Sequence, residues 1–353
     1  MFNPDDMERF TNNEIVNMYG KLQEELTKTI ISKLRKAGDI NSYTRQQIRN
    51  LRQIGGRKVF YEALNKTNNL SSKRKKEIKK LFDEIGDQSL KGYKETFNER
   101  NVKYELSPSM INILNYASRT SNKDLKNLTK SIAYASKESY IKAVDTMFKE
   151  VVTGSYDYEK SIKKAVRDLT KQGITLKTKD GRNEQIDVAV KRNLYTSINQ
   201  AVKDLGLQIG EAIDYNYVMI GHSSKCRPTH NVIDDVIMSK KAFEEYEYLT
   251  EEINCNHRVN YDWDKDFEGV GYKIQYGNQH LSDIQVRKNY EKQQKSNYYA
   301  RQVRAKKKQI ASGDNSDKVK QQLRLAQTKL RLFNKANGIE QDYFQTWTVG
   351  YNK

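Results

Sequence analysis

The chain has 353 residues, and 63 basic against 45 acidic side chains give a formal net charge of +18. Its hydrophobic content of 36% is low and its charged content of 31% is high for a compact globule, so we expect long helices with narrow apolar stripes. No apolar run approaches the ~20 residues of a membrane span, and we expect no membrane partner. The positive charge favours a polyanion, either nucleic acid or an acidic protein face.

The first residues have neither the basic nor the apolar region of a secretory signal, so we expect no signal peptide. The chain contains two cysteines, which cannot build a disulfide framework. Synthesis in a reducing compartment is the expectation that follows.

Helical spacing of apolar residues predicts helices over residues 11–36 and 44–64. Gly55 and Gly56 are expected to break or bend the second helix. A third, basic helix begins at Ser71 or Ser72, and its lysines are typical of a solvated face, with DNA contact as the alternative. The apolar stripe of the first helix comprises Ile15, Met18, Tyr19, Leu22, Leu26, Ile30 and Leu34.

The middle of the chain is predicted to be mostly long helices. Pro108 marks a break, a helix resumes beside it, and the apolar pattern is long from residue 121 to 152. A helix over 156–172 should stop at Gly173. Residues 174–177 favour a strand that turns at Asp180-Gly181, and a further helix is predicted over 186–212.

A Cys/His cluster lies between two short apolar runs, residues 217–220 and 259–261. Both cysteines and three of the four histidines of the chain fall in this stretch. Sulfur and imidazole are common zinc ligands, and here they occur as Cys-x3-His and Cys-x-His pairs. The pattern predicts a small knuckle in which two strands flank the candidate metal ligands Cys226, His230, Cys255 and His257.

Four interpretations of this cluster stay open. The first is a structural zinc site, and the second is a metal-free knuckle with hydrogen-bonded histidines and buried thiols. The third is a metal-dependent nuclease that pairs His222 or His230 with Asp234 or Asp235. The fourth is a nucleophilic Cys226 with His230 or His257 as base. No phosphate-binding glycine loop, Ser-His-Asp pattern or paired-carboxylate motif is found, and we expect no enzymatic activity.

The C-terminal part is strongly basic. Residues 285–335 contain fifteen Lys or Arg and three acidic residues, a net charge of +12. Two apolar stripes separated by a turn over 312–316 predict an antiparallel helical hairpin. Three ammonium groups near its tip are costly to hold together without an anion. The candidate contacts to nucleic acid or an acidic partner are Lys288, Lys292, Lys295, Arg301, Arg304, Lys306, Lys307 and Lys308.

Several stretches, in one order, resemble the minor capsid proteins of tailed phages, in the branch related to the F protein of phage Mu. The resemblance covers about 240 residues; the first hundred match in helical character alone. The stretches are Gly154-Ser-Tyr-Asp-Tyr158 with Ile162–Asp168, Ile186–Asn193 with Asn199-Gln200, Arg227-Pro-Thr-His230, Asn254-Cys-Asn-His257, Tyr298-Tyr-Ala-Arg-Gln302 and Lys329–Gly338.

The resemblance implies a structural virion protein, made in the host cytoplasm and placed in the phage head near the portal. It implies support of head assembly and of DNA packaging or ejection, with the portal protein, other head proteins and genomic DNA as partners. The alternatives are a DNA-binding protein delivered with the genome and a metal-dependent nuclease. Zinc is the candidate cofactor, through the Cys/His cluster.

The predicted fold is mostly α, with several modules. An N-terminal helical region covers residues 1–104, and a long-helix domain covers 105–215. A small α+β knuckle with the Cys/His cluster covers 216–280, and a basic helical hairpin with a tail covers 281–353.

Overall fold

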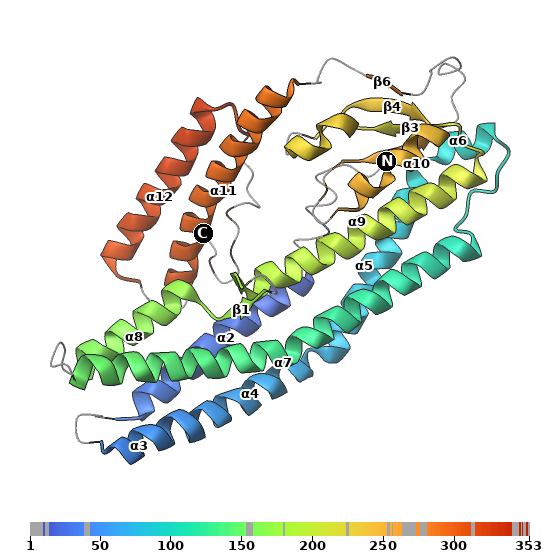
Figure 1. Cartoon of the computed structure of the whole chain (residues 1–353). Helices are drawn as coiled ribbons and strands as arrows, with labels where there is room; N and C mark the ends of the chain where they lie inside the picture. The colour runs from blue at the N-terminus through green and yellow to red at the C-terminus, as the bar shows by residue number, and fades with distance from the viewer. Residues whose placement is uncertain are drawn as a thin grey trace. The chain divides into compact units, whose positions relative to one another are not determined.

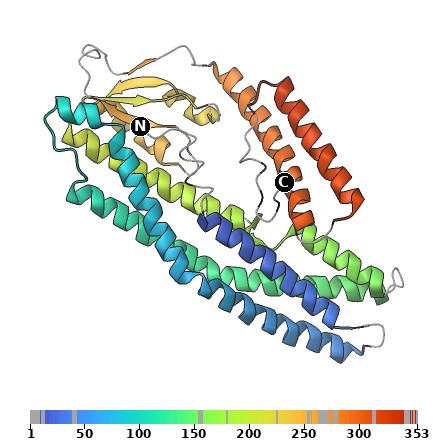
Figure 2. The same ribbon diagram turned by 180° about the vertical axis from the view of Figure 1, so that it is seen from behind.

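The computed structural model (Figures 1 and 2) describes residues 10, 14–38, 43–152, 158–178, 181–223, 226–252, 255, 257–262, 273–275, 281–311, 315–340, 346, 348 and 351. The mostly α fold is confirmed. The chain groups into two compact units, the first from 1–11, 76–122 and 192–296 and the second from 12–75, 123–191 and 297–353. Each unit takes segments from several of the four expected regions, and that division stays a prediction.

Four of the five unit boundaries fall within helices, which are α5 (Ser71–Lys91), α7 (Pro108–Val152), α9 (Ile186–Ala212) and α11 (Asp283–Ala311). The break expected at Pro108 is therefore the start of one continuous helix of 45 residues. Proline is well placed at such a start, because the first amides of a helix have no intrahelical acceptor.

In the second unit, α2 (Glu14–Lys36) packs against α4 (Gly56–Asn69) and α8 (Tyr158–Gln172). Every residue of the apolar stripe predicted for α2 is buried, because spacings of three and four place them on one face. Gly38 follows the helix with φ of 69°, a left-handed conformation that glycine adopts without a steric penalty. The helix over 11–36 is thus confirmed from Glu14, and residues 11–13 lie outside the described residues.

The expected break at Gly55 and Gly56 does not occur. A short helix α3 (Arg45–Asn50), capped by Thr44, continues through a π-helical turn (Leu51–Gly55) into α4. Gly55 instead allows a close approach, since a Cβ there would lie 2.2 Å from the hydroxyl oxygen of buried Tyr140. That hydroxyl donates a hydrogen bond to the Leu51 carbonyl at 3.4 Å.

A small hairpin follows α8. Gly173, with φ of 68°, ends the helix as predicted. Strands β1 (Thr175–Lys177) and β2 (Asn183–Gln185) then pair antiparallel, and α9 begins directly afterwards. The predicted strand and the predicted helix over 186–212 are confirmed. The expected turn residue Asp180 and the Gly154 motif fall outside the described part of the chain.

The first unit contains an antiparallel sheet of strand order β5-β3-β4-β6, together with α6 (Lys94–Glu99) and α10 (Lys240–Glu251). Strands β3 (Tyr217–Ile220) and β5 (Val259–Asp262) are the two that the sequence predicted. Strands β4 (Val236–Ser239) and β6 (Lys273–Gln275) and helix α10 were not predicted. Side chains from β3, β4, β5 and α10 form one apolar core.

Helix α9 meets this sheet at two glycines. Gly206 and Gly210 are one turn apart and therefore share a face of the helix. A Cβ at Gly210 would lie 2.6 Å from the Cβ of Tyr261, and one at Gly206 would lie 3.2 Å from its ring. Tyr261 of β5 packs against these two glycines. Its ring contacts that of Tyr215 edge-to-face, with ring centroids 5.1 Å apart.

The predicted C-terminal hairpin is confirmed as α11 and α12 (Asp317–Ala336), which lie side by side in both views (Figures 1 and 2). Ala300 and Val303 of α11 and Leu323 and Leu330 of α12 form its apolar seam. Tyr299 packs against this seam and Phe333, whereas Tyr298 is half exposed, as expected for adjacent helical residues. Among the described residues, no helix is both long and apolar enough to cross a membrane.

Candidate functional site

The sheet brings the two halves of the Cys/His cluster together. Ile220, at the end of β3, pairs with Val236 at the start of β4 and with Val259 at the start of β5. The segment before β4 and the segment before β5 therefore meet where β3 ends, at the same end of the three strands. The first segment carries Cys226 and a 3-10 helix (Pro228–Ile233) that contains His230, and the second carries Cys255 and His257.

The structure buries all four predicted metal ligands and places them in two groups that share His257. In the first group, the Cys255 sulfur lies 3.7 Å from His230 Nδ1 and 3.5 Å from His257 Nδ1. In the second, the Cys226 sulfur lies within 4.8 Å of a ring nitrogen of His257 and a carboxylate oxygen of Asp234, and the thiol donates to the Arg227 carbonyl at 3.3 Å. Both cysteines are free thiols.

Asp234 is a buried carboxylate that contacts His257, His222 and the Ser223 amide. One oxygen lies 3.0 Å from His257 Nε2 and accepts the Ser223 amide at 2.8 Å, and the other lies 2.8 Å from His222 Nδ1. Burial raises the pKa of this carboxyl, but the hydrogen bonds from His257, Ser223 and His222 outweigh it and lower the pKa overall. The sequence suggested Asp234 and His222 only as parts of a nuclease.

Glu252 is a functional candidate that the sequence did not reveal. Its Oε2 lies 3.0 Å from His230 Nε2 and accepts a hydrogen bond from Arg227 at 2.7 Å. The hydrogen bond from His230 is the largest of the effects that lower its pKa. Glu252 follows α10 directly, so its place depends on a helix that was itself not predicted.

The cluster is electrostatically coupled. Burial raises the pKa of the Cys255 thiol, but hydrogen bonds from His230 and His257 more than offset this and lower it. Burial alone would lower the pKa of His257. Asp234 and the two thiols raise it by more, so the pKa is raised overall. The arrangement thus favours a thiolate beside a protonated or metal-bound imidazole.

Burial decides which chemistry the cluster can perform. Cys255, His230 and Asp234 are each 1% exposed, and Cys226 is 7% exposed. A phosphodiester or peptide carbonyl would need direct access to these atoms in either enzymatic interpretation. The geometry therefore favours a structural role over nuclease or cysteine-nucleophile chemistry.

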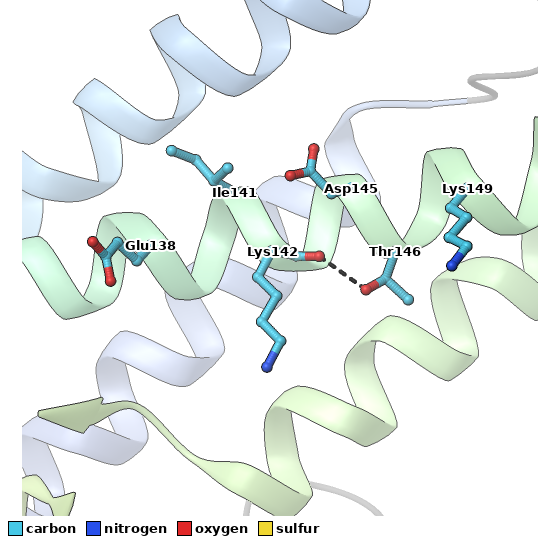
Figure 3. A pocket seen from close by; sticks show the side chains of 6 residues that line it. All are labelled: Glu138, Ile141, Lys142, Asp145, Thr146 and Lys149. Atoms are coloured by element: carbon cyan, nitrogen blue, oxygen red, sulfur yellow. Dashed lines mark hydrogen bonds between the residues drawn. The ribbon is translucent and has the colours of Figure 1, made fainter. Parts of the chain in front are cut away.

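A hollow of about 320 Å³ lies along α7 in the second unit (Figure 3). It is lined by Ile141 and by charged and polar side chains, of which Asp145 pairs with Arg52 at 2.9 Å and Lys142 donates to Gln172 at 3.2 Å. Figure 3 also shows Thr146 bonded to the Lys142 carbonyl. This lining contains neither cysteine nor histidine. It therefore offers no further pairing of a nucleophile with a general base.

The basic residues of the hairpin fall into two groups. Lys288, Lys292, Lys295 and Arg301 are exposed, and so are the six Lys and Arg residues of α12. Arg304 is half buried, and burial lowers its pKa, an effect that Asp187 partly offsets.

The second group consists of Lys306, Lys307 and Lys308, each of which has a partner within the chain. Lys306 donates to Gln322 at 2.6 Å, and Lys307 donates to the Thr346 carbonyl at 2.9 Å. Lys308 pairs with Asp187. The anion expected near these lysines is thus partly supplied by the protein itself, and their contact with an outside polyanion stays a prediction.

Comparison with known families decides which proteins this chain belongs with. The family described as phage minor capsid protein 2 matches residues 2–335. The chain belongs to this family. No curated protein and no solved structure matches it. The resemblance to phage minor capsid proteins is thereby confirmed, and with it a place in the virion among other head proteins.

Proposed function

We propose that this minor capsid protein lies close to the portal of the phage head and supports head assembly and DNA packaging or ejection. One observation carries the proposal. In a protein of a capsid family, residues 285–335 hold a net charge of +12 on a hairpin whose apolar side chains face each other. The exposed lysines and arginines of the hairpin, which do not include Lys306, Lys307 and Lys308, therefore face outward, toward a partner.

Duplex DNA fits this charge better than a small anion does. Lys288, Lys292 and Lys295 are exposed at spacings of four and three, which places them along one side of α11. A row of positive charge can follow a phosphate backbone without reading bases. Helix α12 carries exposed basic residues of its own; they are Lys318, Lys320, Arg324, Lys329, Arg331 and Lys335.

An acidic surface on the portal is the competing partner, because it would recognise the same charges. The two partners differ in their salt response. Neutralising phosphates releases condensed counterions, and log affinity falls with log salt by about 0.9 for each contact on duplex DNA. A folded acidic surface has no comparable condensed layer.

The test measures binding of the full chain to duplex DNA across a salt series. A variant with Lys288, Lys292 and Lys295 changed to Gln should bind more weakly, with a log-log slope shallower by about 2.7. The matched control changes three exposed lysines of α7, Lys123, Lys126 and Lys130, to Gln and should keep the wild-type slope.

Salt-independent binding, no binding at low salt or an equal effect of the control would exclude DNA as the partner of the hairpin. Incorporation of the α11 variant into heads would then test the acidic surface. A reconstruction of the particle without imposed symmetry tests the position itself, because the proposal requires a few copies around the portal.

A further inference from the structure

We propose that the Cys/His cluster is a structural metal site that binds one zinc-type ion through Cys226, His230, Cys255 and His257, with Asp234 and Glu252 orienting the two imidazoles. This proposal concerns the sheet of the first unit and does not depend on the proposed role of the hairpin. Its argument rests on ligand spacing, imidazole orientation, the fourth ligand and burial.

The distances within the cluster fit tetrahedral coordination. Zn–S bonds of ~2.3 Å and Zn–N bonds of ~2.0–2.1 Å, at a tetrahedral angle, separate a sulfur from a nitrogen ligand by about 3.6 Å. The Cys255 sulfur lies 3.5 Å from His257 Nδ1 and 3.7 Å from His230 Nδ1. The sulfur thus lies at the ligand spacing from each nitrogen, and the three ligand atoms fall within 4.8 Å of one another.

The outer nitrogens of both imidazoles are occupied by carboxylates. His257 Nε2 lies 3.0 Å from Asp234, and His230 Nε2 lies 3.0 Å from Glu252. Metal-binding histidines commonly donate their second N–H to a carboxylate, which fixes the tautomer and directs the free lone pair at the metal. Here this pairing leaves both Nδ1 atoms directed toward one sulfur.

The metal-free alternative keeps the same contacts as hydrogen bonds. A Cys255 thiolate accepts from both Nδ1 atoms when both imidazoles are protonated, and a Cys255 thiol accepts from one Nδ1 and donates to the other. A cation at the meeting point instead satisfies both lone pairs and the sulfur at once.

Cys226 supplies the fourth ligand from a second buried group that shares His257 with the first. Its sulfur, a carboxylate oxygen of Asp234 and a ring nitrogen of His257 all lie within 4.8 Å of one another, and a bound ion would draw this sulfur toward Cys255 and His230. Asp234 could compete, but its oxygens are engaged by His257, His222 and the Ser223 amide. Two sulfurs and two imidazoles form a ligand set that zinc accepts in closed structural sites.

The consequence is a cross-link between two irregular segments. Cys226 and His230 lie before β4, whereas Cys255 and His257 lie before β5, and all four are buried. A metal joins these segments through about four bonds in a place where the backbone forms no regular sheet. The site is closed to substrate and suited to stabilising the fold.

The first measurement is metal content. Full-length protein purified without chelator should contain about one zinc per chain, and chelation should lower its melting temperature. Cobalt added to the stripped protein should give the absorption bands of tetrahedral cobalt bound to thiolate. Absence of both the zinc and the cobalt spectrum would overturn the proposal and leave a metal-free knuckle.

Variants test the ligand set. Cys255→Ser and Cys226→Ser should each lose the stoichiometric zinc, and wild-type affinity in Cys226→Ser would overturn that ligand assignment. Should Cys255→Ser fail to fold, Glu252→Gln is the second variant, because Glu252 is exposed on the surface. It should still bind one zinc at saturation, but about 10- to 100-fold more weakly.

The matched control for Glu252→Gln is Glu245→Gln, which removes an exposed carboxylate from α10. Its zinc affinity, measured by competition with a chromogenic chelator, should equal that of the wild type. Equal affinities in Glu252→Gln and Glu245→Gln would overturn the orienting role of Glu252.

Discussion

Lys308 Nζ lies 2.7 Å from a carboxylate oxygen of Asp187, and the two side chains are only 13% and 12% exposed. The pair joins the last turn of α11 to the first turn of α9 within the second unit. Asp187 also lies where the helix dipole favours a negative charge. A lysine that the sequence marked as a contact for an outside anion therefore has an internal structural partner.

Lys308→Met should lower the free energy of unfolding by about 3 kcal/mol, because it leaves the Asp187 carboxylate buried without its cation. Chemical denaturation measures the loss. Lys306→Met is the control and should cost less than about 1.5 kcal/mol, because Lys306 donates to a neutral amide. Lys308→Met combined with Asp187→Leu should recover most of the loss. A double variant as unstable as the single one would show that the ion pair is not the cause.

Gly55→Ala should destabilise the second unit by about 1–3 kcal/mol, because the new methyl group meets the buried Tyr140 ring. Gly56→Ala is the neighbouring control. Its Cβ would have ordinary contacts at 3.4 Å, and alanine is the better helix former. Thermal unfolding compares the two, and Tyr140→Ala in the Gly55→Ala background should cost less than it does in the wild type. Equal effects of the two glycine changes would contradict the close approach.

Two buried tyrosines should make the fold sensitive to alkali. Burial is the main cause that raises the pKa of Tyr140 to about 12 and that of Tyr215 to about 12. The unfolded chain releases these protons near pH ~10. Stability that is complete below that pH should therefore fall between about pH 10 and 12, by up to ~1.4 kcal/mol per pH unit for each tyrosine.

The comparison that isolates this effect is a variant in which Tyr140 and Tyr215 are both changed to Phe. Urea unfolding on either side of pH ~10 should show a shallower alkaline loss than in the wild type. Changing the exposed Tyr248 and Tyr298 to Phe should leave the profile unchanged. Identical profiles for all three proteins would show that the buried phenols do not govern it.

The wild-type protein should not cleave DNA with magnesium, manganese or zinc, because the cluster's thiols and His230 are buried. His230→Ala should change folding, metal content or head assembly alone. A nicking assay on supercoiled plasmid is the measurement. Metal-dependent nicking that disappears in His230→Ala would contradict a purely structural role and favour the nuclease.

The long helices were predictable because their burial pattern is local in sequence. The stripe from Ile15 to Leu34 is periodic, and Gly38, Gly173 and Gly338 end elements with positive φ. Strand β4 was not predictable in this way, because its first three residues are apolar on both faces and do not alternate with polar ones. The π-helical turn before Gly55 depends on Tyr140, which lies 85 residues away in the chain.

The meeting of the four candidate ligands was predictable because two runs expected to form the strands of one small knuckle flank them. Their outer partners were not. Glu252 contacts His230 across 22 residues of sequence, and it does so only because α10 returns the chain to the cluster. A single acidic residue in a chain with 45 of them has no sequence pattern that marks it.

Tyr261 packs on Gly206 and Gly210, and this contact fixes the register of β5 in the sheet. A slip of β5 by one residue would turn Tyr261 outward and press Asn260 or Asp262 against α9. The same slip would carry Cys255 and His257 about 3.3 Å along the strand direction, away from His230. The alignment of the cluster is thus set by an aromatic ring that packs on two glycines of a helix, because only Arg258 separates His257 from the start of β5.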